Sequence, residues 1–434
     1  MCQPLLRVVS CRPKTHPCPA CGTRGRRQRL LVRVIRSLAY RQEAFTEVRY
    51  AEYRSDCECS KTFRSWPKGH PQKADYDDLV RKAVLDRLLG DGLNAEKTIE
   101  AMRRDFLLDL SFGFLDDCLT DHLHRIDCPG HRQRVLERFS GILCVDELHL
   151  GCRTLLLATD PIADEIVGFA LVSANDQDHM GRFLRMLAGW GLSPEMVVSD
   201  GSNLYPALLA EVWPKAEHQL CVFHILQDMT KKVLDAVRRL RRRLGNKGKG
   251  GRKHKGGRRK KGAKKRPASK GPTCKEMAAF AFKRRHLVAK RTENLDEREK
   301  ADLEKMISWL PELGVLRDFC QEAYEAWGSE QSLKVARWRW TRLRNKAEYQ
   351  AVPELAKALE SLGKGKLEKT LSFLGQPEGR RQKTNNHVER MNRKLRFDEK
   401  TRYKWRSRKS IVRWVVLRIA RHVPKTLEQE DLAE

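Results

Sequence analysis

One apolar stretch near the middle of the chain limits what the chain can fold into. Residues 141–151 read GILCVDELHLG, an apolar run that ends in two adjacent acids, Asp146 and Glu147. An ionised carboxylate on a buried strand is heavily disfavoured unless a metal ion or a base compensates its charge. The stretch therefore predicts a buried strand that delivers a functional acid, and we expect partner acids elsewhere in the chain.

The charge balance of the chain indicates what such acids act on. Lys and Arg number 87 against 56 Asp and Glu, which gives a formal net charge of +31. A protein this basic is suited to binding a polyanion, and nucleic acid is the leading candidate. An anionic membrane is the alternative, but the sequence shows neither a run of about 18 apolar residues nor a signal peptide. We therefore expect a cytoplasmic protein without a membrane partner.

Cysteines near the N-terminus are arranged in two close pairs. The pairs are Cys18 with Cys21 and Cys57 with Cys59. Two such pairs can bind one tetrahedral Zn²⁺ when a hairpin, expected here around the strand-like segment 47–54, brings them together. Cys11 and His16 are alternative ligands, and the cysteines could also be ordinary surface or core thiols. We predict a zinc-ribbon-like domain over residues 1–70, with Zn²⁺ in a structural role.

The next segment, residues 71–135, has helical periodicity. Helices are expected at 75–89, 95–106 and 112–126, with a glycine-containing break after the first. This pattern resembles a helix-turn-helix, whose last helix can enter a major groove. The third helix carries acids in its middle, which disfavours close base contact. DNA binding and simple packing both stay open for this unit.

From residue 141 onward the pattern alternates between strands and helices. Strands are expected at 142–145, 154–158, 166–172, 196–199 and 219–223, with helices at 178–190 and 203–212. This order predicts an α/β fold with a ribonuclease H-like mixed sheet. The ends of the first and fourth strands lie side by side in that sheet, and they carry Asp146 and Asp200.

Several motifs together resemble the DDE transposases of bacterial insertion sequences, in particular the ISL3-type and related groups. CVDELHLG and VVSDGSNLY match the surroundings of the family's first two acids, NNHVERMNR matches the third, and LCVFH resembles its C-x-x-H element. The resemblance implies that Asp146, Asp200 and Glu389 are catalytic and bind Mg²⁺ or Mn²⁺. The possible accessory residues are Cys221, His224, Asn385 and Asn386. One Cys and one His are an incomplete zinc set, so packing or contact with the scissile DNA is expected of the C-x-x-H pair.

The resemblance also implies a reaction and its partners. It points to an enzyme that cuts and joins double-stranded DNA, at the element's terminal repeats and in target DNA, by two-metal phosphoryl transfer. By analogy, we expect a homodimer or larger assembly on DNA, associated with the bacterial nucleoid in the cytoplasm. Two rival hypotheses are a non-catalytic DNA-binding regulator derived from such an enzyme and a structure-specific ribonuclease H-like nuclease.

Other acids and bases near these motifs have weaker claims to a role. Successive side chains of a strand point to opposite faces, so Glu147 should point away from Asp146 and is expected to be a bystander. Asp160, Asp164 and His149 are expected to be loop residues.

A long insertion separates the second and third acids. Its segment 246–272 has thirteen Lys and Arg and no acids, which predicts a disordered loop that binds the DNA backbone without reading sequence, or a merely tolerated insertion. The remainder of residues 231–379 is expected to be helical, so that residues 136–230 and 380–425 form the catalytic domain. Trp338 and Trp340 are expected to serve the core, with base stacking as the alternative.

Overall fold

The computed structural model describes residues 3–55, 59, 62–68, 75–247, 271–401 and 407–422. Its contacts group the chain into two compact units. The first comprises Met1–Arg134, His149–Arg153 and Met391–Glu434, and the second comprises Val135–Leu148 and Thr154–Arg390. Nearly all of the basic segment 246–272 lies outside the described residues, so its role in DNA binding stays a prediction.

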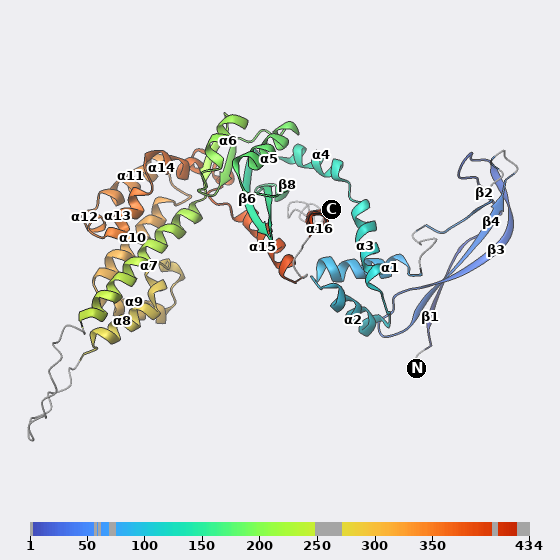
Figure 1. Cartoon of the computed structure of the whole chain (residues 1–434), viewed down its shortest axis with the longest axis horizontal. Coiled ribbons are helices and arrows are strands. Elements are labelled where there is room, and N and C mark those ends of the chain that lie inside the picture. Colours follow the sequence, from blue (N-terminus) through green and yellow to red (C-terminus); the bar gives the residue numbers. More distant parts are fainter. Residues whose placement is uncertain are drawn as a thin grey trace, which may run out of the picture. The chain divides into compact units, whose positions relative to one another are not determined.

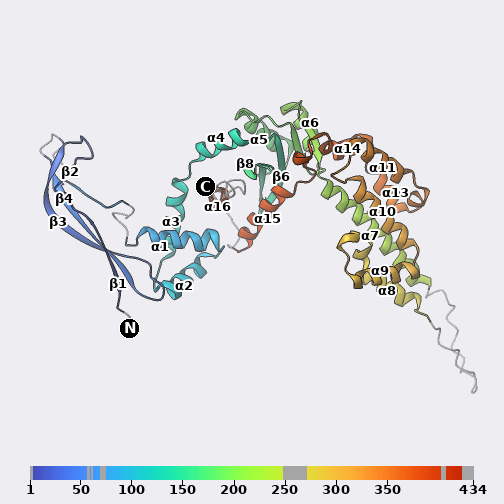
Figure 2. The ribbon, with the colours of Figure 1, turned by 180° about the vertical axis from the view of Figure 1, so that it is seen from behind.

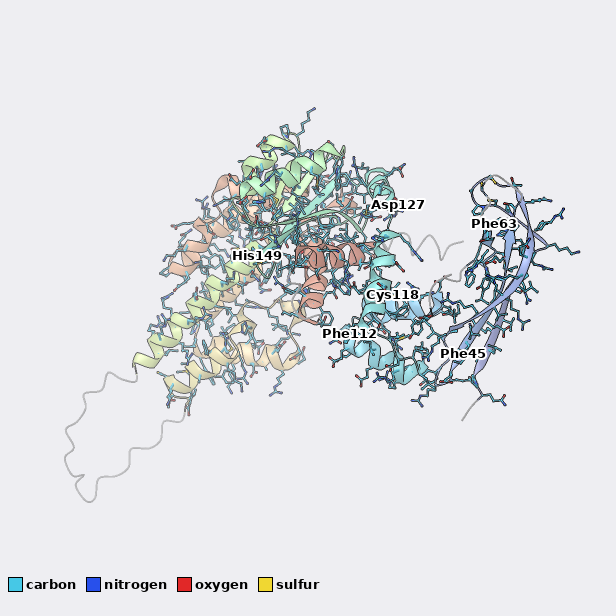
Figure 3. The ribbon with its side chains drawn as sticks, turned by 45° about the vertical axis from the view of Figure 1, so that its right-hand side comes forward. Phe45, Phe63, Phe112, Cys118, Asp127 and His149 are labelled. Carbon is cyan, nitrogen blue, oxygen red and sulfur yellow. The ribbon has the colours of Figure 1, made fainter. Side chains whose placement is uncertain are left out.

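The N-terminal part of the first unit is a five-stranded sheet in the order β1-β4-β3-β2, with β5 paired to β4. The strands are β1 (Leu5–Cys11), β2 (Thr15–Pro17), β3 (Arg24–Arg36), β4 (Ala44–Arg54) and β5 (Thr62–Arg64). In Figure 3, Phe45 labels β4 and Phe63 labels β5. The long β3 was not predicted, because arginines fill most of the positions between its apolar residues and hide the strand pattern.

Short helices follow this sheet, all in the same unit except the end of α4, which belongs to the second unit. They are α1 (Asp78–Leu85), η1 (Asp86–Gly90), α2 (Ala95–Phe106), α3 (Phe112–His124), α4 (Cys128–Arg138) and, near the C-terminus, α16 (Arg408–Ala420). The side chains of Asp77, Asn94 and Ser111 cap the first three α-helices by accepting a backbone N–H. The extra helix α4 was not predicted, since its Pro-Gly pair suggests a turn, although proline is tolerated in the first turn of a helix.

The acids of α3 are held by arginines of the same unit. Asp121 forms an ion pair with Arg81 at 2.5 Å, and Asp116 pairs with Arg413 of α16 at 2.7 Å. α16 packs against α3, a contact that the sequence did not predict. Two of the three acids of α3 are therefore paired and the helix packs against α16, while DNA binding by this unit stays a prediction.

The second unit contains a five-stranded sheet in the order β10-β9-β6-β7-β8. Its strands are β6 (Ile142–Leu150), β7 (Arg153–Asp160), β8 (Glu165–Val172), β9 (Met196–Ser199) and β10 (Glu217–Leu220). β9 runs parallel to both β6 and β10, whereas β7 and β8 are antiparallel. This mixed order confirms the predicted ribonuclease H-like α/β fold.

Helices α5 (Gln177–Gly189) and α6 (Tyr205–Val212) cover one face of this sheet (Figure 2). Val145 of β6 shares a hydrophobic core with Leu184 of α5 and Leu208 of α6. This packing fixes the first part of β6, the residues that precede Asp146 and Glu147.

Two strands differ from their predicted ends. β6 continues to Leu150, so Asp146 lies within the strand, and His149 is an exposed strand residue instead of a loop residue. β10 ends at Leu220, and Val222 and Phe223 belong to the following helix. A short apolar run does not distinguish a strand from the buried first turn of a helix.

Two acids that were expected to lie in a loop have structural roles. Asp160 is buried at the end of β7, where its carboxylate accepts hydrogen bonds from backbone N–H groups, among them that of Ser140 at 2.6 Å. Asp164 follows β7, and its carboxylate lies 2.7 Å from Nε2 of the buried His387. The expectation of a loop position was therefore wrong for Asp160, the last residue of β7, and correct for Asp164, which lies in the turn before β8.

The insertion is helical, as predicted. Its elements are α7 (Val222–Lys247), α8 (Cys274–Lys283), η2 (Arg285–Val288), η3 (Thr292–Asn294), α9 (Glu297–Trp309), α10 (Glu312–Ala326), α11 (Leu333–Asn345), α12 (Ala347–Gln350), α13 (Pro353–Glu360), α14 (Lys364–Leu371), η4 (Ser372–Gly375) and η5 (Glu378–Arg380). They share one hydrophobic core, and α7 runs beside α8, α10 and α13 (Figure 1). Trp340 is buried in this core against Trp327, whereas Trp338 is 58% exposed. Trp340 thus serves packing, and stacking stays possible only for Trp338.

Across the described ranges, no helix combines the length and the apolar character that a bilayer crossing requires.

Candidate active site

Strand pairing brings together the chain segments that carry the first two predicted acids. Cys144 of β6 lies opposite Val198 of β9 in the last pair of the parallel register. Asp146 follows Cys144 by two residues within β6, and Asp200 is the first residue after the end of β9. The backbone N–H of Ser202 donates to Oδ1 of Asp200 at 2.9 Å and so orients that carboxylate. Both acids are half-buried at the end of this strand pair.

The third predicted acid comes from helix α15 (Asn386–Thr401). Oε1 of Glu389 lies 3.8 Å from Nε2 of His224, and the Glu389 side chain is 22% exposed. The charge of Asp200 also acts on His224. His224 therefore lies close to two of the three predicted acids.

Asn385 joins the elements that carry these acids. It is fully buried, and its Nδ2 donates to the carbonyl of Val145, the residue before Asp146, at 2.8 Å. Its backbone carbonyl accepts the N–H of Glu389 at 3.2 Å. Asn385 thus fixes the start of α15 against β6, whereas the neighbouring Asn386 is exposed at the first position of the helix.

The C-x-x-H pair lies at the start of α7. The N–H of Cys221 donates to the carbonyl of Ser199 at 2.8 Å, which holds the helix start beside the residue that precedes Asp200. The Cys221 sulfur raises the pKa of His224 to about 9, and the charges of Glu389 and Asp200 act in the same direction while burial opposes them. This imidazole therefore lies in a region of negative potential.

Glu147 is closer to the site than the sequence suggested. Burial raises the pKa of its carboxyl, and the charge of Asp200 raises it further. The buried Tyr205 lies against the same acids, since its pKa is raised well above the ordinary value by burial and then by the charges of Glu147, Asp146 and Asp200. The expectation that Glu147 is a bystander stays a prediction, because the effect of Asp200 on its pKa assigns no role to its carboxyl. In the sequence, only the position of Glu147 next to Asp146 indicated that Glu147 lies near the site, and no pattern predicted that Tyr205 does.

The described N-terminal cysteines also gather. The sulfur atoms of Cys18, Cys21 and Cys59 all lie within 4.8 Å of one another, and Cys57 lies outside the described residues. The N–H of Gly22, at φ +75°, donates to the carbonyl of Cys18 at 2.9 Å and closes the turn. Thiolates at this spacing suit Zn²⁺.

The alternative zinc ligands take no part in this cluster. The ring of His16 packs against Tyr53, at 5.4 Å between centroids, and against Phe63. Within the described part of the chain, the cysteine cluster includes neither His16 nor Cys11.

The three acids fit the hard divalent cation that the resemblance implies. Carboxylate oxygens are the ligands that Mg²⁺ and Mn²⁺ prefer. Oε1 of Glu389 is buried without a hydrogen-bond partner among the described residues, and a buried carboxylate oxygen needs a donor or a cation. Asp146, Asp200 and Glu389 are therefore a suitable donor set.

Comparisons with known proteins identify the family of this chain. A model of the ISL3 group of DDE transposases, described as a transposase, matches residues 143–409. A chain of the Drosophila P element transposase strand transfer complex is similar at 15% identity with a TM-score of 0.36, covering 81% of this chain and 93% of that chain. No curated protein matches. Because the family match extends over more than half of its residues, the chain belongs to the ISL3 family of transposases.

Proposed function

We propose that this DNA transposase cuts and joins strands at a site made of Asp146, Asp200 and Glu389. The observation that supports the proposal is the parallel pairing of β6 with β9, which brings together the chain segments that carry Asp146 and Asp200. The contact of Glu389 with His224, on which the charge of Asp200 also acts, supports placing the third acid in the same site.

These acids would hold Mg²⁺ or Mn²⁺. Two such ions activate the attacking oxygen and stabilise the leaving oxygen of a phosphoryl transfer. The chain's own contribution is to fix the three carboxylates before DNA arrives. Asp146 is held within β6, the backbone N–H of Ser202 orients Asp200, and the buried Asn385 ties the helix of Glu389 to β6.

The proposed substrates are the terminal repeats of the element and a target duplex. The formal net charge of +31 supports attraction to the DNA backbone, with an affinity that falls steeply as salt rises. Binding of two ends would use a homodimer or a larger assembly, and DNA as substrate would keep the protein at the nucleoid.

Zinc is proposed for the N-terminal sheet. Cys18, Cys21 and Cys59 support a structural Zn²⁺, with Cys57 as the proposed fourth ligand. Such an ion would stabilise a sheet whose own hydrophobic cluster at this end is small, comprising Cys18, Ala51, Tyr53 and Phe63.

A strand-transfer assay tests the catalytic site. Full-length protein, a duplex carrying the element ends, target DNA and Mg²⁺ should give joined product. Asp146→Asn, Asp200→Asn and Glu389→Gln should each lower the joining rate by at least 10²-fold, since each removes a metal ligand. The matched control is Asp178→Asn, an exposed acid of α5, which should leave the rate unchanged.

The same assay separates the rival functions. Cleavage without joined product would indicate a nuclease, and DNA binding without cleavage would indicate a regulator. Joining by Asp146→Asn at the wild-type rate would show that the assignment of the site is wrong.

A further inference from the structure

Three side chains of zinc-binding type converge next to the catalytic acids. Ligand atoms of Cys221, His224 and Glu389 all lie within 4.8 Å of one another. The sequence offers only the first two as a pair, which is an incomplete ligand set. The fold supplies the third from a helix that begins more than 160 residues later in the chain.

The backbone sets this convergence. Cys221 precedes the first residue of the 26-residue helix α7, and its carbonyl accepts the N–H of Ile225. A spacing of three residues places Cys221 and His224 on the same side of the helix start. Nε2 of His224 and Oε1 of Glu389 are 3.8 Å apart, whereas two ligands of a tetrahedral zinc ion with bonds near 2.1 Å are about 3.4 Å apart. The His224 nitrogen and the Glu389 oxygen would therefore need to approach each other by roughly 0.4 Å to reach the separation of two zinc ligands.

The surroundings favour a bound cation. The sulfur of Cys221 accepts the backbone N–H of Asn385 at 3.3 Å. Hydrogen bonds of this kind orient a metal ligand and tune its basicity. The buried Oε1 of Glu389 has no hydrogen-bond partner among the described residues, so a cation would satisfy it.

The ligand types select the metal. Sulfur and imidazole favour Zn²⁺ or Co²⁺, whereas Mg²⁺ favours sites made of oxygen alone. We propose that Cys221, His224 and Glu389 bind Zn²⁺ at a second site, which shares Glu389 with the proposed catalytic acids, and that bound Zn²⁺ inhibits the enzyme. The inhibition rests on the proposed function, because zinc at this site engages the carboxylate of Glu389 that the catalytic metal needs. The binding itself does not depend on that function.

Cobalt spectroscopy on the full-length protein tests the binding. Co²⁺ bound to a thiolate gives an intense near-ultraviolet band, to which the N-terminal cysteines and Cys221 should both contribute. Cys221→Ser should remove the contribution of one site, whereas the control Cys152→Ser removes an exposed thiol outside both clusters and should remove none. Equal bands in these two variants would overturn the proposal.

A second variant covers the case in which Cys221→Ser fails to fold. His224 is 34% exposed, so His224→Gln is expected to fold. It should weaken Co²⁺ binding at this site at least tenfold while the N-terminal contribution stays. Unchanged affinity in this variant would also refute the site.

The inhibition is measured as a ratio, so that each variant is its own reference. The joining rate in Mg²⁺ is determined with and without micromolar Zn²⁺. The joining rate of the wild type should fall at least tenfold when zinc is added, and the joining rate of Cys221→Ser should fall much less. Equal inhibition of both would overturn the regulatory part, whereas absence of joining in every protein would refute the proposed function and leave the cobalt result standing.

Discussion

Replacing Asn385 by alanine should damage catalysis more than stability. The change removes the donor to the carbonyl of Val145, a hydrogen bond of 2.8 Å within the core, and leaves that carbonyl unpaired. Such a loss costs about 1–3 kcal/mol. It also frees the first turn of α15, and a misplacement of about 1 Å at Glu389 can lower a catalytic rate by about 10²-fold.

Two measurements on the same preparations decide this prediction. Urea unfolding should show a lower midpoint for Asn385→Ala, whereas the exposed neighbour Asn386→Ala should stay within about 0.5 kcal/mol of wild type. The joining rate, corrected for the folded fraction, should fall about 10²-fold in Asn385→Ala, and added Mg²⁺ should restore part of it. A destabilised variant with an unchanged rate per folded molecule would refute the positioning role.

Three further predictions follow from buried groups and from the cysteine cluster. The guanidinium of Arg317 is buried and donates to three backbone carbonyls of segment 287–290. Arg317→Met should therefore lower the free energy of unfolding by about 3 kcal/mol. Urea unfolding measures this change, and Arg298→Met, at an exposed arginine, is the control that should show none. Burial lowers the pKa of His218 from 6.5 to about 4. Between pH 6.5 and 4 the unfolded chain therefore binds a proton at His218 that the folded chain does not bind, and the free energy of unfolding should fall by about 2–3 kcal/mol. The His218→Gln variant should lack this dependence on pH. Cys18→Ser should lower the zinc content by one equivalent per chain and expose only the N-terminal sheet to proteolysis; unchanged metal content would contradict the zinc assignment.

The sheet was predictable wherever apolar runs are separated by turn residues. Segments 154–158 and 166–172 are bounded by Gly, Asp and Pro, and both form strands near the expected ends. The run 219–223 has no such boundary, so its last residues could not be assigned to a helix from the pattern. Arginines hid β3 for a different reason, since they occupy positions where a strand pattern is usually recognised by uncharged residues.

The site was predictable as a set of acids but not as an arrangement. The parallel pairing of β6 with β9 was predictable from the strand order, and it is the reason to expect Asp146 near Asp200. The positions of Glu147 and Tyr205 depend on how α6 packs on β6, and no local pattern encodes that. The hydrogen bond from Asn385 to β6 joins residues 240 positions apart, and the sequence gives no sign of it.

The two ends of the helical insertion leave and re-enter the sheet at nearly one point. The N–H of Val222 donates to the carbonyl of Lys383 at 2.9 Å, and the buried Gln219 binds the backbone of both Thr370 and Phe373. The roughly 160 residues between Val222 and Lys383 therefore leave the sheet and return to it at positions that are joined by one hydrogen bond. We therefore expect a change in the length of the insertion to leave the path of the chain through the acids unchanged. An engineer could accordingly replace it with a short turn and retain the geometry of β6, β9 and the start of α15.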